Sequence, residues 1–253
     1  MELDEKIRKA YFAAKGRNGS PRLAKDLQVC GTQVSRLTVS RHMRQMGMRC
    51  RLSKRFKVTT DSSHDYKVAP NLLNRVFRRD EPSNACVSDL TYIPCVDGFL
   101  YLTMVLDLFD RKPIGWSMSG SMKASHTVIP AIRMASRNRP FPEGMIFHSD
   151  RGVQYACSQT VNVLKSLKVE QSMSRKGNCW DNAVAESFFK TFKSELIFGT
   201  KLRTKEEMRL IVFEYIEHWY NHKRRFSAFG NMTIDEFWEK YRINNKTTIM
   251  DVA

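Results

Sequence analysis

Hydrophobic residues recur at helical spacing in the first part of the chain. Leu3 and Ile7 lie four positions apart, as do Val39 and Met43. This spacing puts the members of each pair on one face of a helix. Three short helices are therefore predicted. The first spans residues 3–15. The second begins at Ser20, whose hydroxyl caps it, and the third runs from about Ser35 to Met46.

From residue 85 onward the pattern changes to short runs of strand-like residues. The runs "ACVSDLTYIP", "GFLYLTMVLDLFD" and "RKPIGWSMS" predict three strands joined by tight turns, one of them at Asp97-Gly98. Helical and strand-like stretches then alternate, at 125–139, 144–150, 158–169, 170–174 and 181–197. The order βββαβαβα indicates an α/β fold with a mixed sheet flanked by helices. Further helices are expected over 204–221 and 233–242.

The distribution of charge divides the chain into modules. Residues 1–60 carry 15 Lys and Arg against four Asp and Glu, a net charge of +11, while the whole chain carries +16. A basic module therefore precedes a nearly balanced domain. The predicted parts are a helical module over 1–48, a basic linker over 49–80, a core over 81–200 and a C-terminal helical extension over 201–253. The linker's Lys and Arg either follow phosphates or solvate a tether.

Composition narrows the class of partner. A pI of about 9.8 favours a polyanion, and nucleic acid is the first choice. The six Cys are scattered without a CxxC pair, which argues against a zinc site and a disulfide framework and fits a reduced cytosol. The N-terminus lacks the apolar core of a signal peptide, and Asp107 interrupts the longest apolar run. We expect no membrane partner.

The third predicted helix has a polar, basic face opposite its apolar one. That face carries Thr38, Arg41, Arg44 and Gln45. Three short helices with such a face on the last fit a helix-turn-helix, which lays this helix in the major groove of DNA. The alternative is a small helical domain whose basic face is only solvated.

Three acidic residues occupy unusual positions. Asp89 lies within a predicted strand, where an unpaired charge is costly, Asp150 ends the strand 144–150, and Glu186 lies on the helix after a Gly/Asn-rich loop. Carboxylates from two strands and a neighbouring helix can meet at a sheet edge, where a cation such as Mg²⁺ or Mn²⁺ stabilises them. The spacing alone is weak evidence. The alternative is an amphipathic helix with a solvated polar face.

Longer motifs carry a resemblance to a known family. "VSDLTYI", "FHSDRGVQY", "SMSRKGNCWDNAVAESFFKTFKSEL" and "YIEHWYNHKRRFSAFG" resemble the second-frame (OrfB-type) transposases of IS-three-type bacterial insertion sequences, which are relatives of retroviral integrases. The likeness covers nearly the whole chain. It implies an RNase-H-like integrase core behind a helix-turn-helix, with Asp89, Asp150 and Glu186 as the DDE catalytic triad.

The same resemblance implies a reaction and its partners. Such an enzyme frees a 3′-hydroxyl at the end of its own element, and that hydroxyl then attacks another phosphodiester in a transesterification. Two Mg²⁺ or Mn²⁺ ions bridge the triad and the scissile phosphate. The expected partners are the element's terminal inverted repeats, target DNA, further copies of the chain on DNA and, in many relatives, the first-frame protein. The expected place is the bacterial cytoplasm, at the nucleoid.

Residues around the triad are candidates for DNA contacts. Asn182, Lys190 and Lys193 share a helical face with Glu186, and the loop 173–180 before them is expected to be pliable. For each of these residues, the alternative is a solvated surface side chain. The remaining candidates are Arg151, which follows the second acid, and Lys223, Arg224 and Arg225, which form a basic corner in "NHKRRF" together with Asn221.

Two further side chains leave two interpretations open. His148 either lines the site or is a packed, hydrogen-bonded residue. Trp180 either stacks on a base or is a buried anchor for the loop.

Three positions depart from the family pattern. Cys86 stands where the family usually has Trp, Phe226 where it has His, and Asn18 where it has an aromatic residue. None of the three is one of the acids. A catalytically inactive DNA-binding remnant or regulator is therefore the alternative function, and a nuclease on the same fold is a third.

Overall fold

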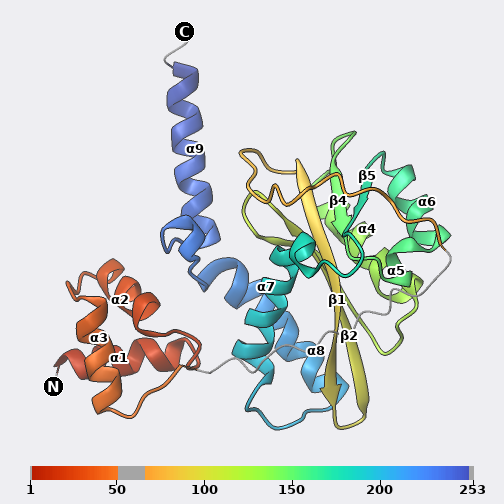
Figure 1. Cartoon of the computed structure of the whole chain (residues 1–253). Helices are drawn as coiled ribbons and strands as arrows, with labels where there is room; N and C mark the ends of the chain where they lie inside the picture. Colours follow the sequence, from red (N-terminus) through yellow and green to blue (C-terminus); the bar gives the residue numbers. More distant parts are fainter. Residues whose placement is uncertain (1, 51–65, 251–253) are drawn as a thin grey trace.

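The structure, a computed structural model of the chain, describes residues 2–50 and 66–250 (Figure 1). The first part is a helical module whose core includes Ile7, Leu23 and Val39, each with no exposed surface. This is the small all-α module that the apolar spacing predicts. Its helices are α1 (Glu2–Ala13), α2 (Ser20–Val29) and α3 (Arg36–Gln45).

Local chemistry sets the ends of these helices. The Ser35 hydroxyl accepts a hydrogen bond from the backbone N–H of Thr38 at 3.0 Å and so caps α3. The prediction of Ser20 as the cap of α2 is wrong. Gly19 occupies that position, no side chain caps the helix, and Pro21 in the first turn presets the backbone instead.

The second part contains a five-stranded mixed sheet in the order β3-β2-β1-β4-β5. The first three strands form an antiparallel meander, and β4 and β5 run parallel to β1. Pairing between β1 and β4 involves only residues 85–87 of β1, so the two strands part beyond Val87. The strands are β1 (Ala85–Cys95), β2 (Gly98–Asp107), β3 (Pro113–Ser119), β4 (Ile146–Ser149) and β5 (Glu170–Met173).

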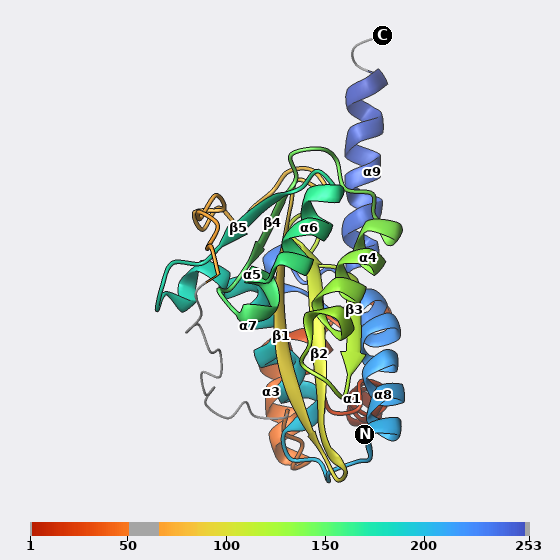
Figure 2. The ribbon, with the colours of Figure 1, turned by 90° about the vertical axis from the view of Figure 1, so that its right-hand side faces the viewer.

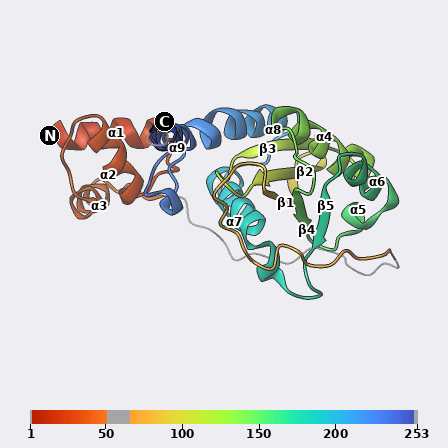
Figure 3. The ribbon, with the colours of Figure 1, turned by 90° about the horizontal axis from the view of Figure 1, so that it is seen from above.

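Helices cover both faces of the sheet, and each face has its own apolar core (Figures 2 and 3). The predicted α/β class with a mixed sheet and flanking helices is confirmed. On one face lie η1 (Ala124–His126), α4 (Val128–Asn138), α5 (Val153–Ala156) and α6 (Ser158–Ser166). On the other lie η2 (Cys179–Asn182), α7 (Ala183–Phe192), η3 (Lys193–Ile197), α8 (Lys205–Phe213) and η4 (Glu214–Lys223).

Several elements depart from the predicted ones. The short α5 is unpredicted. The two long helices predicted over 181–197 and 204–221 each end in a π-helical stretch, η3 and η4. After η5 (Ser227–Phe229), the helix α9 (Ile234–Met250) runs beyond the predicted 233–242 and projects from the body (Figure 1). Within residues 2–50 and 66–250, no helix combines the length and apolar character needed to cross a membrane.

The predicted linker contacts the core from residue 66 onward, and its residues 51–65 lie outside the described ones. Leu73 is fully buried among core residues. The backbone N–H groups of Leu72 and Leu73 donate to the Ser172 hydroxyl at 2.9 and 3.2 Å. The described part of this segment is therefore anchored to the sheet edge, unlike a free tether.

The helical module is also docked on the core. Arg22 of α2 pairs with Glu195 at 2.9 Å, and Arg225 pairs with Asp26 at 2.6 Å. The Arg17 guanidinium lies 5.0 Å from the centre of the Trp219 ring. Ion pairs and a cation–π contact therefore hold α1–α3 beside η3 and η4.

Candidate active site

The three predicted acids come from three elements that meet beside the parting of β1 and β4. Asp89 lies on β1, Asp150 directly follows β4, and Glu186 lies in the first turn of α7. All three side chains are half-buried. The backbone N–H of Leu90 donates to Asp89 at 2.8 Å, and that of Gly152 donates to Asp150 at 2.9 Å.

Electrostatics ties the three carboxyl groups together. Burial, followed by the charges of Asp150 and Glu186, raises the pKa of Asp89 well above its ordinary value. Burial and the charge of Asp150 also raise the pKa of Glu186. Each group therefore senses its neighbours through a medium that screens poorly, which is the usual setting of functional carboxylates.

A metal ion has a suitable set of donors here, although the side chains are not gathered round one point. In the described part of the chain, no three His, Cys, Asp or Glu side chains lie close enough together to hold a metal ion. Three carboxylates nevertheless provide the hard oxygen ligands that Mg²⁺ and Mn²⁺ prefer. The residues fit such an ion by chemistry, and rotation of the side chains would have to bring them together.

Lys193 is a basic residue whose charge acts on this site. Its charge lowers the pKa of Asp89, and its ammonium lies 5.4 Å from the centre of the Tyr92 ring. Burial lowers the pKa of Lys193 itself. Lys190, one turn earlier on α7, is exposed. The two lysines therefore differ, because only Lys193 faces the acids.

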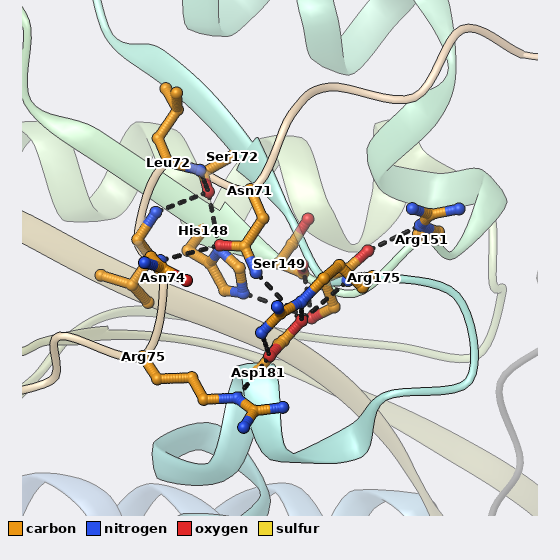
Figure 4. Close-up of polar contacts among 12 residues, drawn as sticks. Asn71, Leu72, Asn74, Arg75, His148, Ser149, Arg151, Ser172, Arg175 and Asp181 are labelled. Atoms are coloured by element: carbon orange, nitrogen blue, oxygen red, sulfur yellow. Dashed lines mark hydrogen bonds and ion pairs between the residues drawn. The ribbon is translucent and has the colours of Figure 1, made fainter.

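His148 belongs to a buried hydrogen-bonded network (Figure 4). Its Nδ1 lies 2.8 Å from the Ser172 hydroxyl and its Nε2 lies 3.2 Å from that of Ser174. Because the Ser172 oxygen already accepts two backbone N–H groups, its own proton points to Nδ1. Burial lowers the pKa of His148 to about 4, so the ring is neutral at pH 7. Of the two interpretations, the packed histidine holds.

The loop before α7 is held by Asp181, which sequence patterns did not single out (Figure 4). This fully buried carboxylate accepts hydrogen bonds from the backbone and guanidinium of Arg175, from Arg75 and from Asn71. Hydrogen bonds from Arg175 lower the pKa of Asp181 far below its ordinary value. Trp180 beside it is 70% exposed, so it is no buried anchor.

A tyrosine that the sequence did not reveal also lies near the acids. The Tyr155 hydroxyl is 2.8 Å from that of Ser88, the residue before Asp89. Burial, with the charges of Asp89 and Asp150, raises the pKa of Tyr155 well above its ordinary value. The Tyr155 hydroxyl therefore stays protonated, and it supports β1 through its hydrogen bond with Ser88.

The predicted DNA-contact residues divide into those at or near the surface and those buried inside the protein. Arg41, Arg44 and Gln45 are exposed on α3, and Lys223 is exposed at the end of η4. Thr38 is half-buried and bonds to the Ser35 hydroxyl, and Arg151 donates to the Ser174 carbonyl at 2.6 Å.

Three predicted contacts are not at the surface. Asn182 is 4% exposed and donates to the Ser88 carbonyl at 3.1 Å. Arg224 pairs with Glu195, and Arg225 pairs with both Asp26 and Glu236. The geometry therefore argues against a DNA contact at Asn182, Arg224 and Arg225, because these side chains are buried and partners within the protein already occupy them. The neighbouring Asn221 is buried too.

Family models match the chain in three places. A model described as an integrase core domain matches residues 79–179, and a second model with the same description matches residues 167–233. A model described as an HTH-like domain matches residues 1–56.

Curated relatives match along almost the whole length. The chain is 38% identical over 240 residues to the transposase InsF for insertion sequence IS3A of Escherichia coli (strain K12), covering 95% of this chain and 83% of the relative. The chain belongs to the IS3-family transposases. It is also 37% identical over 240 residues to the transposase for insertion sequence element IS904 of Lactococcus lactis, covering 94% of each.

Solved structures show only a distant likeness to this IS3-family transposase. An intasome of simian T-cell lymphotropic virus is 13% identical with a TM-score of 0.46, covering 86% of this chain and 69% of that chain. The catalytic domain of Mos1 mariner transposase is 14% identical with a TM-score of 0.46, covering 54% of this chain and 71% of that chain. The family assignment rests on the sequence relatives and the family models.

Proposed function

We propose that this IS3-family transposase cleaves at the 3′ ends of its element and transfers the freed strand by metal-dependent transesterification. Asp89, Asp150 and Glu186 are its catalytic residues in this proposal. The observation that carries it is that these three half-buried acids come from β1, the end of β4 and the first turn of α7, which meet beside the parting of the two strands. In keeping with this, burial and the charge of Asp150 raise the pKa of Asp89 and of Glu186. Acids that destabilise one another inside an integrase core indicate a catalytic role rather than a structural one.

Each residue has a part in the reaction. The three carboxylates would hold two Mg²⁺ or Mn²⁺ ions, which when bound activate the attacking oxygen and stabilise the leaving one. Lys193, whose charge already acts on Asp89, contacts the phosphate next to the reacting bond. Asn182 fixes the start of α7 to β1 through the Ser88 carbonyl. Lys190 and Arg151 contact the DNA backbone further out.

The helical module over 1–48 would read the element ends. Arg41, Arg44 and Gln45 of α3 are exposed for a major groove, with Thr38 beside them, and Lys223 adds a phosphate contact. The linker over 49–80 joins this module to the core over 81–200 and its extension over 201–253. The partners are the terminal inverted repeats, target DNA, further copies of the chain on DNA and a first-frame protein, at the nucleoid in the cytoplasm.

A strand-joining assay tests the proposal. Labelled element-end DNA is incubated with Mg²⁺ or Mn²⁺ and either wild type, Glu186→Gln or the control Glu170→Gln, which changes an exposed acid on β5. Wild type and the control should join strands, while Glu186→Gln should lose at least about 10³-fold in rate, of the order seen when a key charge-stabilising group is removed. Joining by Glu186→Gln at the wild-type rate would remove Glu186 from the triad.

The inactive remnant is the rival, and its basis is the three departures from the family pattern. Each of these residues is buried in the structure. Cys86 is buried in the core under α4–α6, Phe226 packs edge-to-face on Tyr220, and Asn18 donates to Asp26 at 2.9 Å. The fold therefore accommodates all three departures, and an activity assay separates the remnant from the enzyme. Intact DNA binding without joining, with or without first-frame protein, would favour the remnant.

A further inference from the structure

Asp181 connects two segments that are far apart in the sequence (Figure 4). Its Oδ1 accepts from Arg75 Nε at 2.7 Å, and its Oδ2 accepts from Asn71 Nδ2 at 2.9 Å. The same carboxylate accepts from the Arg175 backbone N–H at 2.9 Å. Residues 71–75, called the clasp below, are thereby tied to the loop that leads into α7.

The clasp also reaches the strand that carries the second acid. Its Leu72 and Leu73 N–H groups bind the Ser172 hydroxyl, which in turn donates to His148 on β4. Pro70, just before the clasp, accepts from the backbone N–H of Met173 at 3.2 Å. One short segment therefore contacts the loop before Glu186 directly and reaches the strand before Asp150 through Ser172 of β5.

The backbone of the clasp is held in an uncommon conformation. Asn74 and Arg75 have φ values of 43° and 62°, in the left-handed region that side chains other than glycine rarely adopt. Such residues persist where tertiary contacts fix them, and they gather at functional sites. Here the fixing contacts are Asn74 N–H to Asn71 Oδ1 at 2.9 Å and Arg75 to Asp181.

We propose that Asp181 is a positioning residue of the active site and that Arg75 of the clasp holds it in place. The inference rests on the proposed function. Asp181 lies two positions before Ala183, where α7 starts, and Glu186 is in the first turn. A shift of the Asp181 backbone therefore moves Glu186 relative to Asp150. The clasp thereby sets the distance between Glu186 and Asp150, which are to bind the same cation.

The same arrangement limits where the loop can move. Its outer part carries Lys176 and Trp180, both exposed, and stays available for DNA. Its two ends are fixed by Asp181 and by the hydrogen bond from Arg151 to the Ser174 carbonyl. The predicted pliability is thus confined to the tip, and the end next to Glu186 is preorganised, as a catalytic constellation requires.

The test uses Arg75→Gln, which removes the positive charge that pairs with Asp181 from outside the loop. Arg78→Gln is the matched control, because Arg78 has the same side chain three positions away and is 94% exposed. Mn²⁺ affinity is measured by electron paramagnetic resonance in the full chain, and hydrogen exchange is measured over residues 174–182. Strand joining is then followed against Mn²⁺ concentration, with Arg75→Lys as the conservative rescue.

Arg75→Gln should weaken Mn²⁺ binding about tenfold, the usual effect of losing a group that orients a metal ligand. Exchange over residues 174–182 should become faster, joining should need correspondingly more Mn²⁺, and Arg75→Lys should recover part of the loss. Equal Mn²⁺ affinity in Arg75→Gln and Arg78→Gln, with joining by wild type, would overturn the positioning role alone. A wild type that neither binds Mn²⁺ nor joins strands would overturn both the role and the proposed function.

Discussion

Glu195 shows how a single buried acid stabilises a junction between modules. It accepts from Arg22 at 2.9 Å, from the Tyr215 hydroxyl at 3.0 Å and from Trp219 Nε1 at 3.1 Å, and it pairs with Arg224 at 3.4 Å. Burial alone would raise the pKa of Glu195, but Arg224 and Arg22 outweigh it and the pKa lies below its ordinary value. The folded state therefore prefers the charged form.

Replacing this acid should be costly. Glu195→Gln keeps the shape but leaves the buried Arg224 and the half-buried Arg22 without their counter-charge, and we expect a loss of about 3 kcal/mol in the free energy of unfolding at pH 7. Urea denaturation measures the loss. Glu143→Gln, which removes an exposed pair with Lys168, should cost less than about 1 kcal/mol. Equal losses in the two variants would show that Glu195 contributes no more than a surface acid.

The same residue predicts a dependence on pH. A carboxyl whose folded pKa is depressed stabilises the protein above its unfolded pKa, about 4.3 for Glu, and loses that contribution as pH falls through the folded value. The difference in unfolding free energy between wild type and Glu195→Gln should therefore be full at pH 7 and shrink below about pH 4.3. Urea titrations at pH 7, 5, 4 and 3.5 test this, and a constant difference would contradict the sign.

Residue-scale prediction from sequence was possible where the signal was local. Asp89 could be proposed because a charge within an apolar strand is unusual, and Glu186 because of the motif around it. Asp181 and Glu195 could not be found in this way. Their partners Arg75 and Arg22 lie 106 and 173 positions away, and local patterning contains no information on such pairs. For the same reason Arg224 and Arg225 looked like a surface patch.

At the scale of elements, β3 and α4 approach each other closely at Gly115. A Cβ built at Gly115 would overlap the backbone oxygen of Ala131 and lie 2.5 Å from the backbone nitrogen of Ala135. Backbone atoms cannot rotate away as a side chain can. The absence of a side chain at Gly115 therefore lets α4 lie directly on the strand.

Gly115→Ala should push α4 off the sheet. We expect a loss of about 2–3 kcal/mol in the free energy of unfolding, at the upper end for overpacking, because no rotamer relieves the clash. Gly120→Ala is the matched control, since a Cβ at Gly120 meets nothing within 4 Å. Thermal unfolding followed by circular dichroism compares the two, and a Gly115→Ala midpoint equal to that of Gly120→Ala would contradict the account.

The order of elements followed from the sequence because alternation and helical spacing are local. The π-helical interruptions of the two long helices could not be predicted in this way. The π-helical stretches η3 and η4 occur where Glu195 and Trp219 turn inward toward the helical module, and tertiary contacts at this junction override the regular helical pattern.

At the scale of the whole molecule, the chain is held together by charge between its modules. Besides the pairs of Glu195 and Asp26, Glu214 of η4 pairs with Lys15 at 3.1 Å. Glu195 and Glu214 of the core thus meet bases of the helical module, and Asp26 of the module meets Arg225 of the core. Part of the module's positive charge is neutralised on this side. Arg41 and Arg44 of α3 remain exposed.

Removing these contacts should release the module without unfolding it. The double variant Arg22→Gln/Asp26→Asn should increase the radius of gyration in small-angle scattering, while the circular dichroism spectrum stays unchanged because each part keeps its own core. Lys9→Gln, an exposed change on α1, serves as the control. Scattering curves that coincide for all three proteins would show that other contacts suffice for docking.

The gap between β1 and β4 is bridged by a side chain in place of a strand. Pairing with β4 ends at Val87, and the next carbonyl, that of Ser88, accepts a hydrogen bond from the Asn182 amide instead. A side chain at the start of α7 therefore replaces the neighbouring strand at this point. Peeling α7 away would bare that carbonyl at a cost of about 1–3 kcal/mol. This hydrogen bond therefore couples the strand edge to the start of α7. Another strand in this gap would have closed the sheet beside Asp89.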